Sequence, residues 1–381
     1  MRELLKRLMR ILHLGAVFRQ LRRVGYQVLD SLGCLFLTLR GVVLRRNDQQ
    51  PMLMPQVKKI LLIRIDRIGD LVLTTPAIRA MRAAFAQAHI DALVNPYAAD
   101  IIIANPHIDR VLRNGVDVVT RDYDLAIAFH PGWQPNRIAF ASGARMRIGF
   151  SGQGGGFWLT HHIPDDRDTR IQHEVDFVLQ ALRPLGISPA DRRLEVSVTD
   201  DGERFAQEFW QRHNIRGTVI FLQPGAQQQY VRWRLEGFSA VCRRLVEEHH
   251  VTIIVSASQS ETALVFALTS AVPQGLISCV GERLTNIISL MRKSTLYLGN
   301  VTGPMHIASA LNLPIVAITG MQGSRDDIRC WAPLSSDIIL VRHEMPCARC
   351  HPGDCANIRC MREISEDEVF AAAEKMVKKY G

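Results

Sequence analysis

The chain has 381 residues, which is enough for two domains, and 47% of them are hydrophobic, which excludes an intrinsically disordered protein. The formal net charge of +9 is uneven: residues 1–50 contain ten Lys or Arg and three acidic residues, a net +7, and the rest of the chain carries +2. Because that remainder has neither a basic stripe nor a nucleic-acid motif, the basic composition is no argument for a nucleic-acid partner.

The first 56 residues are predicted to form a basic amphipathic helical extension and a linker. Apolar residues recur there at roughly helical spacing with arginines between them, as in helices that lie on anionic membrane surfaces. The alternative is a helix that packs on the rest of the protein with its arginines in water. The early apolar runs are short and interrupted by arginine, so we expect no transmembrane helix, no secretory signal and a cytoplasmic location.

Residues 58–76, KKILLIRIDRIGDLVLTTP, contain the first candidate site. Residues 60–65 form a short aliphatic run that is typical of a buried parallel strand. A turn follows, in which Gly69 can take a positive φ. Asp70 then lies at the carboxyl end of the strand, where ligands bind in open α/β sheets. From these residues alone, Asp70 is either a carboxylate that faces a ligand or the N-cap of the next helix, a position that Asp favours.

Strand and helix patterns alternate from residue 57 onward, which predicts parallel sheets flanked by helices. In the first half we expect strands at 60–65, 90–94, 124–129 and 145–150, and helices at 74–87 and 173–185. The more polar residues 186–217 indicate a domain boundary and contain a predicted helix at 203–213.

The alternation then restarts. We expect strands at 218–222, 251–257, 276–280, 295–299 and 314–319, and helices at 235–249, 261–270, 284–292 and 305–311. A last helix opens at Ser365, which forms a capping box with Glu368. The predicted fold class is α/β, with two doubly wound, Rossmann-like domains at residues 57–200 and 201–381 that follow the extension at residues 1–56.

The second candidate site lies in residues 298–314, which form a strand, a turn of small residues and a helix. Thr302 and Gly303 lie where the free N–H groups of a helix start point outward, which makes an anion site suited to a diphosphate. Gly225, at the end of another predicted strand, makes a neighbouring turn. His306 either donates to a phosphate oxygen or packs against a strand, and an isolated histidine is more often structural.

The chain resembles the ADP-heptose lipopolysaccharide heptosyltransferases, glycosyltransferase family 9, over residues 58–377. The stretches that carry the resemblance are IRIDRIGDLVLTTPAIRA at 63–80, YDLAI at 123–127, SGARMRIGF at 142–150, QPGA followed by RW within 223–233, VGERL at 280–284 and TGPMHIASAL at 302–311. The resemblance implies a GT-B fold, in which the two Rossmann-like domains face a cleft, the first on the acceptor side and the second binding the donor nucleotide.

The resemblance also implies an activity, namely transfer of a heptose or related sugar from a nucleotide-diphosphate donor, ADP-heptose first, to a lipid-linked saccharide of the lipopolysaccharide core or a related surface glycan. It implies no cofactor, no required metal and a place on the inner face of the bacterial inner membrane. Asp70 falls on the family's catalytic base, a carboxylate that takes the proton of the attacking hydroxyl. The implied donor-binding residues are Gly225, Gln227, Arg232, Glu282, Thr302, Gly303 and His306.

Two departures from the family pattern fall on the donor side. Val301 stands where the family has Asp, and Val231 stands where it has Lys. Arg232 or Arg234 could supply the missing positive charge with different geometry. The alternatives to an active transferase are therefore a degenerate relative that binds nucleotide or glycan without transfer, and an epimerase or other enzyme with two such domains.

Four cysteines form the pattern C-x2-C-x4-C-x4-C: Cys347, Cys350, Cys355 and Cys360. Such spacing can hold a structural zinc ion or an iron–sulfur cluster. Cysteines in this region also recur in the family without a metal that the chemistry requires. Reduced thiols or a redox-sensitive knot are therefore the other interpretation.

Overall fold

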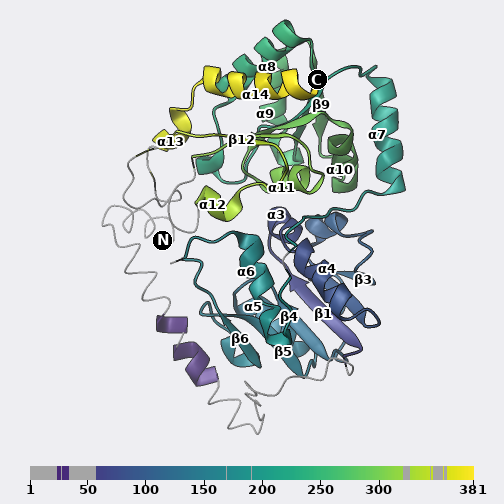
Figure 1. The fold of residues 1–381 in the computed structure, drawn as a ribbon, viewed down its shortest axis with the longest axis vertical. Coiled ribbons are helices and arrows are strands. Elements are labelled where there is room, and N and C mark those ends of the chain that lie inside the picture. The colour runs from purple at the N-terminus through teal and green to yellow at the C-terminus, as the bar shows by residue number, and fades with distance from the viewer. Residues whose placement is uncertain are drawn as a thin grey trace.

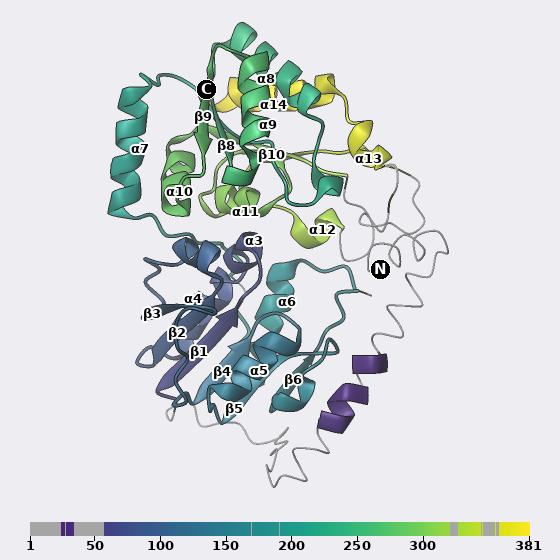
Figure 2. The same ribbon diagram turned by 180° about the vertical axis from the view of Figure 1, so that it is seen from behind.

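The computed structural model of the protein describes residues 24–26, 28–33, 57–168, 170–189, 191–320, 327–343, 345, 355 and 358–381. These residues build two α/β units, which lie one above the other in Figure 1 and are seen from behind in Figure 2. Each unit contains a six-stranded parallel sheet with helices packed around it. The predicted α/β class with two doubly wound sheets is confirmed.

The N-terminal unit has the strand order β3-β2-β1-β4-β5-β6. Its strands are β1 (Lys59–Arg64), β2 (His89–Val94), β3 (Arg110–Arg113), β4 (Leu125–Ala128), β5 (Met146–Ser151) and β6 (His161–Pro164). Its helices are α3 (Ile68–Val72), α4 (Thr75–Ala84), η2 (Pro96–Ile101), α5 (Trp133–Ala141), η3 (Gly156–Trp158), α6 (Glu174–Gln180) and η4 (Arg183–Leu185). The order reverses beside β1, so the crevice of this sheet opens at the carboxyl end of β1.

The C-terminal unit has the strand order β12-β11-β10-β7-β8-β9, with its reversal beside β7. Its strands are β7 (Val219–Gln223), β8 (Thr252–Ala257), β9 (Leu276–Val280), β10 (Leu296–Asn300), β11 (Ile315–Ile318) and β12 (Ile338–Val341). Its helices are α7 (Asp200–Arg212), η5 (Gln229–Val231), α8 (Leu235–His249), η6 (Gln259–Glu261), α9 (Thr262–Ala271), α10 (Leu284–Lys293), α11 (Gly303–Ala310), α12 (Ile328–Trp331), α13 (Arg359–Arg362) and α14 (Glu366–Tyr380). The domain boundary that we propose, between residues 200 and 201, falls at the start of α7, which packs on α10.

The central strands follow from their sequence. Strand β1 is buried on both faces, and Ile60, Leu61 and Ile63 are 0% exposed, which explains its continuous aliphatic run. The predicted capping box of the last helix is confirmed: the Ser365 hydroxyl accepts from the backbone N–H of Glu368, and the Glu368 carboxylate accepts from that of Ser365.

Some predicted elements are wrong or missing. The helix expected at 173–185 ends at Gln180 and gives way to a short 3-10 turn that contains Pro184, because proline has no N–H to continue an α-helix. Strands β3 and β6 were not predicted, because these four-residue edge strands contain too many polar residues to produce an apolar run. Strand β12 was also missed, although its sequence, IILV, is entirely apolar.

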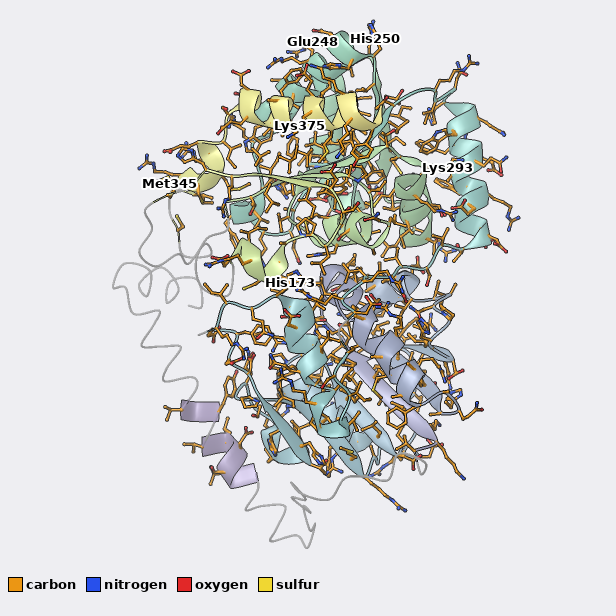
Figure 3. The ribbon with its side chains drawn as sticks, viewed as in Figure 1. His173, Glu248, His250, Lys293, Met345 and Lys375 are labelled. Atoms are coloured by element: carbon orange, nitrogen blue, oxygen red, sulfur yellow. The ribbon has the colours of Figure 1, made fainter. Side chains whose placement is uncertain are left out.

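The two units meet along an apolar interface. One hydrophobic cluster contains buried residues of both units, among them Leu71 of α3 and Met305 of α11, and these two helices pack on each other. His173, labelled in Figure 3, lies where the units meet, and its Nε2 is 2.9 Å from the carbonyl oxygen of Ala332. Such contacts hold the carboxyl ends of β1 and β10 against one another.

The N-terminal extension is described only at residues 24–26 and 28–33, which are helical and lie at the periphery of the N-terminal unit (Figure 1). The Asp30 carboxylate accepts from the backbone N–H of Gly156 at 3.1 Å, and Tyr26 lies against Gly154. Within the described part of the chain, we find no helix with the length and apolarity that crossing a membrane requires.

Candidate active site

A cavity of about 1280 Å³ lies between the two units, at the carboxyl ends of their sheets. Every catalytic or donor-binding residue expected from the sequence lines it: Asp70, Gly225, Gln227, Arg232, Glu282, Thr302, Gly303 and His306. The other seven residues, which lie 155 to 236 positions after Asp70 in the chain, therefore share one site with it, because parallel strands bring their carboxyl ends to the same edge of a sheet.

Asp70 is not an N-cap. Helix α3 begins at Ile68, its N-cap is Arg67, and no side chain caps it. The Asp70 Oδ1 instead accepts from Arg64 Nη2 at 2.9 Å. The capping alternative is therefore wrong, and the carboxylate is held by an arginine of the preceding strand.

Gly69 is needed for a reason other than the predicted one. It is not among the residues with positive φ. A Cβ at Gly69 would instead lie 2.8 Å from His306 Cδ2 and 3.2 Å from the Cα of Gly303. Glycine here permits close approach of α11 to α3, and this long-range neighbour could not be read from the turn itself.

The charges around Asp70 are buried and mostly acidic. The Arg64 guanidinium, 3% exposed, binds the carboxylates of Asp66, Asp70 and Glu174 at 2.8, 2.9 and 3.2 Å. Burial, followed by the negative charge of Asp66, raises the pKa of Asp70 to about 7, although Arg64 opposes the shift. A carboxyl group with this pKa can take up a proton near neutral pH.

A second arginine anchors this group. Arg167 binds Glu174 through Nε at 2.9 Å and Asp165 through Nη1 at 2.8 Å, and its guanidinium lies 4.3 and 4.7 Å from the ring centres of Phe150 and Phe177. Burial opposes ionisation of Glu174, but Arg167 and Arg64 outweigh it and lower the pKa of this carboxyl. Glu174 therefore keeps its negative charge beside Arg64. The sequence did not reveal Arg64, Arg167 or Glu174 as parts of the site.

The predicted diphosphate turn lies at the start of α11. Thr302 is the N-cap residue, and its side chain makes no capping bond. His306, 4% exposed, has a buried Nδ1 with no hydrogen-bond partner among the described residues. Burial, and then the nearby His173, lower the pKa of His306 to about 3, so the ring is neutral. A neutral imidazole whose Nδ1 has no partner can donate a hydrogen bond to a ligand beside this turn or accept one from it.

A buried asparagine positions the loops on this side. Asn300 Oδ1 accepts from the backbone N–H of Trp233 at 3.0 Å, and its Nδ2 donates to the carbonyl of Pro224 at 2.8 Å. Because Asn300 is the last residue of β10, it joins the loop after β7 to the turn that contains Thr302.

The two candidate arginines point to different places. Arg232 lines the cavity, donates to the carbonyl of Ala226 at 2.5 Å and lies 3.4 Å from Glu261 Oε1. Arg234 turns toward α14, where it binds Glu366 at 2.7 Å and the carbonyl of Ile364. Arg234 is therefore excluded as a substitute for the missing lysine.

Glu261 is a cavity residue that was missed from the sequence. Its carboxylate accepts from the Ser258 hydroxyl at 2.7 Å and lies so close to Gly225 that a Cβ there would collide with it. Ser258 and Glu261 form a capping box just after β8, and this S-x-x-E pattern was the available signal. A carboxylate at this edge can accept hydrogen bonds from the hydroxyls of a sugar or nucleoside.

Four further residues of the cavity wall are either exposed polar residues or buried valines. Glu282 is exposed and accepts from Asn286 Nδ2 at 2.9 Å, and Gln227 is exposed. The valines at the two departures, Val231 and Val301, both line the cavity and are 9% and 7% exposed. The donor side of the cavity thus lacks the two charges that the family pattern places there.

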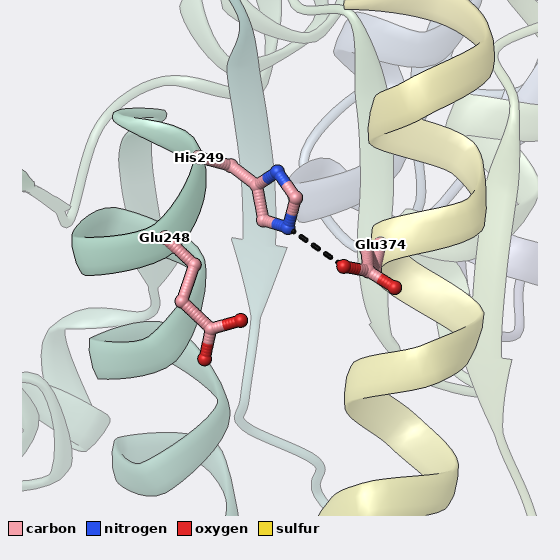
Figure 4. A group of neighbouring side chains, drawn as sticks. All are labelled: Glu248, His249 and Glu374. Carbon is pink, nitrogen blue, oxygen red and sulfur yellow. Dashed lines mark hydrogen bonds and ion pairs between the residues drawn. The ribbon is translucent and has the colours of Figure 1, made fainter.

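The cysteine pattern cannot be followed as a whole. Cys347 and Cys350 lie outside the described residues; Cys355 is exposed and Cys360 is partly buried. Among the described residues, the group with metal-ligand geometry is Glu248, His249 and Glu374, drawn in Figure 4. Its carboxylates already bind cations: Glu374 pairs with Lys378 at 2.9 Å, and Glu248 pairs with Arg244 at 3.2 Å. Ion pairing explains this group.

Two doubly wound sheets that face a shared cavity define the class of GT-B enzymes. The chain matches the family model "Glycosyltransferase family 9 (heptosyltransferase)" over residues 111–358, and it belongs to this family of glycosyltransferases. Lipopolysaccharide heptosyltransferase 3 of Escherichia coli K12 is 23% identical over 351 residues, which cover 81% of this chain and 95% of that protein. The family and the enzyme class expected from the sequence are confirmed.

Solved structures agree on the fold. The family 9 glycosyl transferase of Veillonella parvula superposes with a TM-score of 0.74 at 21% identity, covering 84% of this chain and 98% of that one. The E. coli ADP-heptose lipopolysaccharide heptosyltransferase II gives a TM-score of 0.67 at 18% identity, covering 84% and 99%. The predicted GT-B fold is confirmed.

Proposed function

We propose that the protein transfers a heptose or related sugar from a nucleotide-diphosphate donor, ADP-heptose first, to a saccharide of the lipopolysaccharide core or a related lipid-linked glycan. The observation that carries the proposal is the placement of Asp70 and of the turn at Thr302 and Gly303 around one cavity, on helices that pack against each other. The two E. coli relatives are named as lipopolysaccharide heptosyltransferases, and the solved one of them is named as an ADP-heptose enzyme.

In the proposed reaction, an acceptor hydroxyl gives its proton to the Asp70 carboxylate while its oxygen forms the bond to the anomeric carbon of the sugar. The bond from that carbon to the diphosphate breaks, and the diphosphate leaves with the electron pair. Thr302, Gly303 and His306 bind the leaving diphosphate through backbone N–H groups and the imidazole. The pKa of about 7 at Asp70 suits a group that takes up a proton near neutral pH.

The location that we propose is peripheral, on the anionic inner face of the bacterial inner membrane. The net charge of +7 in residues 1–50 supports it. So do four apolar side chains of the described helical residues, each at least half exposed: Val24, Val28, Leu29 and Leu32. Spacings of four and eight residues put Val24, Val28 and Leu32 on one helix face, and Tyr26 and Asp30 on the face that contacts the N-terminal unit.

The test is incubation of the full chain with a panel of nucleotide sugars and a lipid A–core extract. We expect release of the nucleoside diphosphate and a gain of one sugar in the glycan mass, with ADP-heptose giving the highest rate. Tight binding of nucleotide sugars without any mass gain across the panel would instead support the degenerate relative, for which the apolar Val231 and Val301 are the argument.

A further inference from the structure

The cavity needs a cation for a leaving diphosphate, and the expected sources do not provide a free one. Position 231 is a valine, Arg234 faces α14, and His306 is neutral. Arg232 lines the cavity, but its Nη2 already donates to the Ala226 carbonyl and lies 3.4 Å from the Glu261 carboxylate, and its Nε, which has no partner among the described residues, is buried. A diphosphate bound only at the start of α11 would keep most of its charge uncompensated.

Arg67 lies in the right place on the opposite unit. It is the N-cap residue of α3, it is exposed, and it lines the cavity. The residues that follow it touch the diphosphate turn: a Cβ on Gly303 would lie 3.2 Å from the backbone nitrogen of Gly69 and 3.2 Å from Ile68 Cβ. Arg67 therefore projects from the backbone segment that packs directly on the start of α11.

Arg67 is also uncommitted. Of the three cavity-lining arginines that the structure describes, Arg232 pairs with Glu261 and Arg283 lies 3.8 Å from Asp100, whereas Arg67 makes no ion pair with any described residue. Arg64, one turn of chain earlier, is saturated by three carboxylates. An exposed guanidinium beside an anion site is the group that phosphate binds best.

We propose that Arg67, on the acceptor-side unit, binds the leaving diphosphate of the nucleotide sugar across the interface and replaces the charge that the family's lysine supplies from the other unit. This inference rests on the proposed function, because it takes the ligand to be a nucleotide-diphosphate sugar. The base and the cation for the leaving group then come from the same turn after β1, three residues apart.

The test is calorimetric binding of ADP and of AMP to the full chain without acceptor. For Arg67→Ala we expect ADP affinity to fall by roughly ten- to a hundredfold, as for loss of a charge-assisted phosphate contact, and AMP affinity by less than about threefold. Arg67→Lys is expected to retain part of the difference. The matched control is Arg121→Ala, which removes the same charge from an exposed arginine of the same unit outside the cavity.

Several results would overturn the proposal: unchanged ADP affinity in Arg67→Ala, an equal loss for ADP and AMP, an equal loss in Arg121→Ala, or a wild-type chain that gains nothing from the second phosphate. Unchanged ADP affinity together with a raised KM for the acceptor would assign Arg67 to a phosphate of the acceptor instead. The proposed function fails separately. If ADP binding depends on Arg67 and no sugar is transferred, the contact stands and the transferase assignment does not.

Discussion

The surroundings of Asp70 raise the pKa of its carboxyl group, although the carboxylate is still paired with Arg64. Three carboxylates share the single guanidinium of Arg64, and all four groups are largely buried. Such a cluster costs stability, because each buried ion loses its hydration. A buried cluster of this kind with a perturbed carboxyl beside a cavity is typical of functional sites, and it makes Asp70 the residue to test first.

Replacing Asp70 by Asn is expected to lower the transfer rate by roughly 10²–10⁴-fold, the usual effect of losing a general base. ADP affinity should stay within about threefold, because the carboxylate has no part in our account of diphosphate binding. Initial rates of ADP release and calorimetric titration measure the two effects. A variant with more than half of the wild-type rate and the same product would rule out Asp70 as the base.

The pH dependence of the rate should report the Asp70 carboxyl. Asp70 accepts a proton only when ionised, and its pKa of about 7 places the loss of activity on the acid side of neutrality. Glu174→Gln removes a negative charge near Asp70, and Arg64 then pairs only with Asp66 and Asp70. Both changes lower the pKa of Asp70, so the acid limb of kcat/KM should move down by about one pH unit.

The matched control is Asp165→Asn, which removes a carboxylate that binds Arg167 but not Arg64. Its acid limb should move much less than that of Glu174→Gln. An unchanged limb in Glu174→Gln, with the melting temperature preserved, would show that Glu174 has no influence on the base.

At the scale of elements, the sequence was informative about the central strands and the turns after them, and much less about what those turns touch. The aliphatic runs of β1, β7 and β10 and the small residues that follow placed Asp70, Thr302 and Gly303 at carboxyl ends, and topology did the rest. Gly69 was expected to be needed for a positive φ, but it is needed because a side chain there would collide with α11, whose first residue, Gly303, is 234 positions away in the chain. Glu174 and Arg167 were missed because a local sequence pattern does not show which charged residues, distant in the chain, come into contact when the protein folds.

The contact of α3 with α11 gives a prediction for Gly69→Ala. The added Cβ would lie 2.8 Å from His306 Cδ2, so α11 or its histidine must shift. Because displacements near 1 Å can cost about 10²-fold in rate, we expect kcat/KM to fall at least tenfold while the melting temperature changes by only a few degrees. Gly25→Ala is the control, since its Cβ would meet nothing within 4 Å. Full activity in Gly69→Ala would show that this spacing is unimportant.

At the scale of the whole molecule, the charge and the apolar surface of the extension lead to a test of the membrane location that we propose. The full chain should sediment with anionic vesicles, and less so at high salt, whereas a chain truncated to begin at Pro55 should not. The sharper variant is Val28→Asp with Leu32→Asp, in which two side chains that are 52% and 56% exposed can no longer enter lipid. Its binding should fall at least about tenfold, since each buried CH₂ contributes about 0.8 kcal/mol.

The control pair is Val116→Asp with Val118→Asp, which adds the same two charges at exposed apolar positions, 59% and 78% exposed, in the loop between β3 and β4. Equal losses in the two double variants would mean that charge alone attaches the protein. No loss in either variant would mean that the face with Val28 and Leu32 does not contact lipid.

The backbone contact between Gly69 and Gly303 has a consequence for how specificity can diverge in such an enzyme. Since two residues without side chains meet there, the distance between the turn that carries Asp70 and the start of α11 depends on a close approach of main chain to main chain. Wall positions such as 231 and 301 can then change from charged to apolar, and alter which sugar is accepted, without altering that distance. We therefore expect that enzymes of this kind which use different donors differ at residues that line the cavity, whereas both glycines stay unchanged because the reaction needs their close contact.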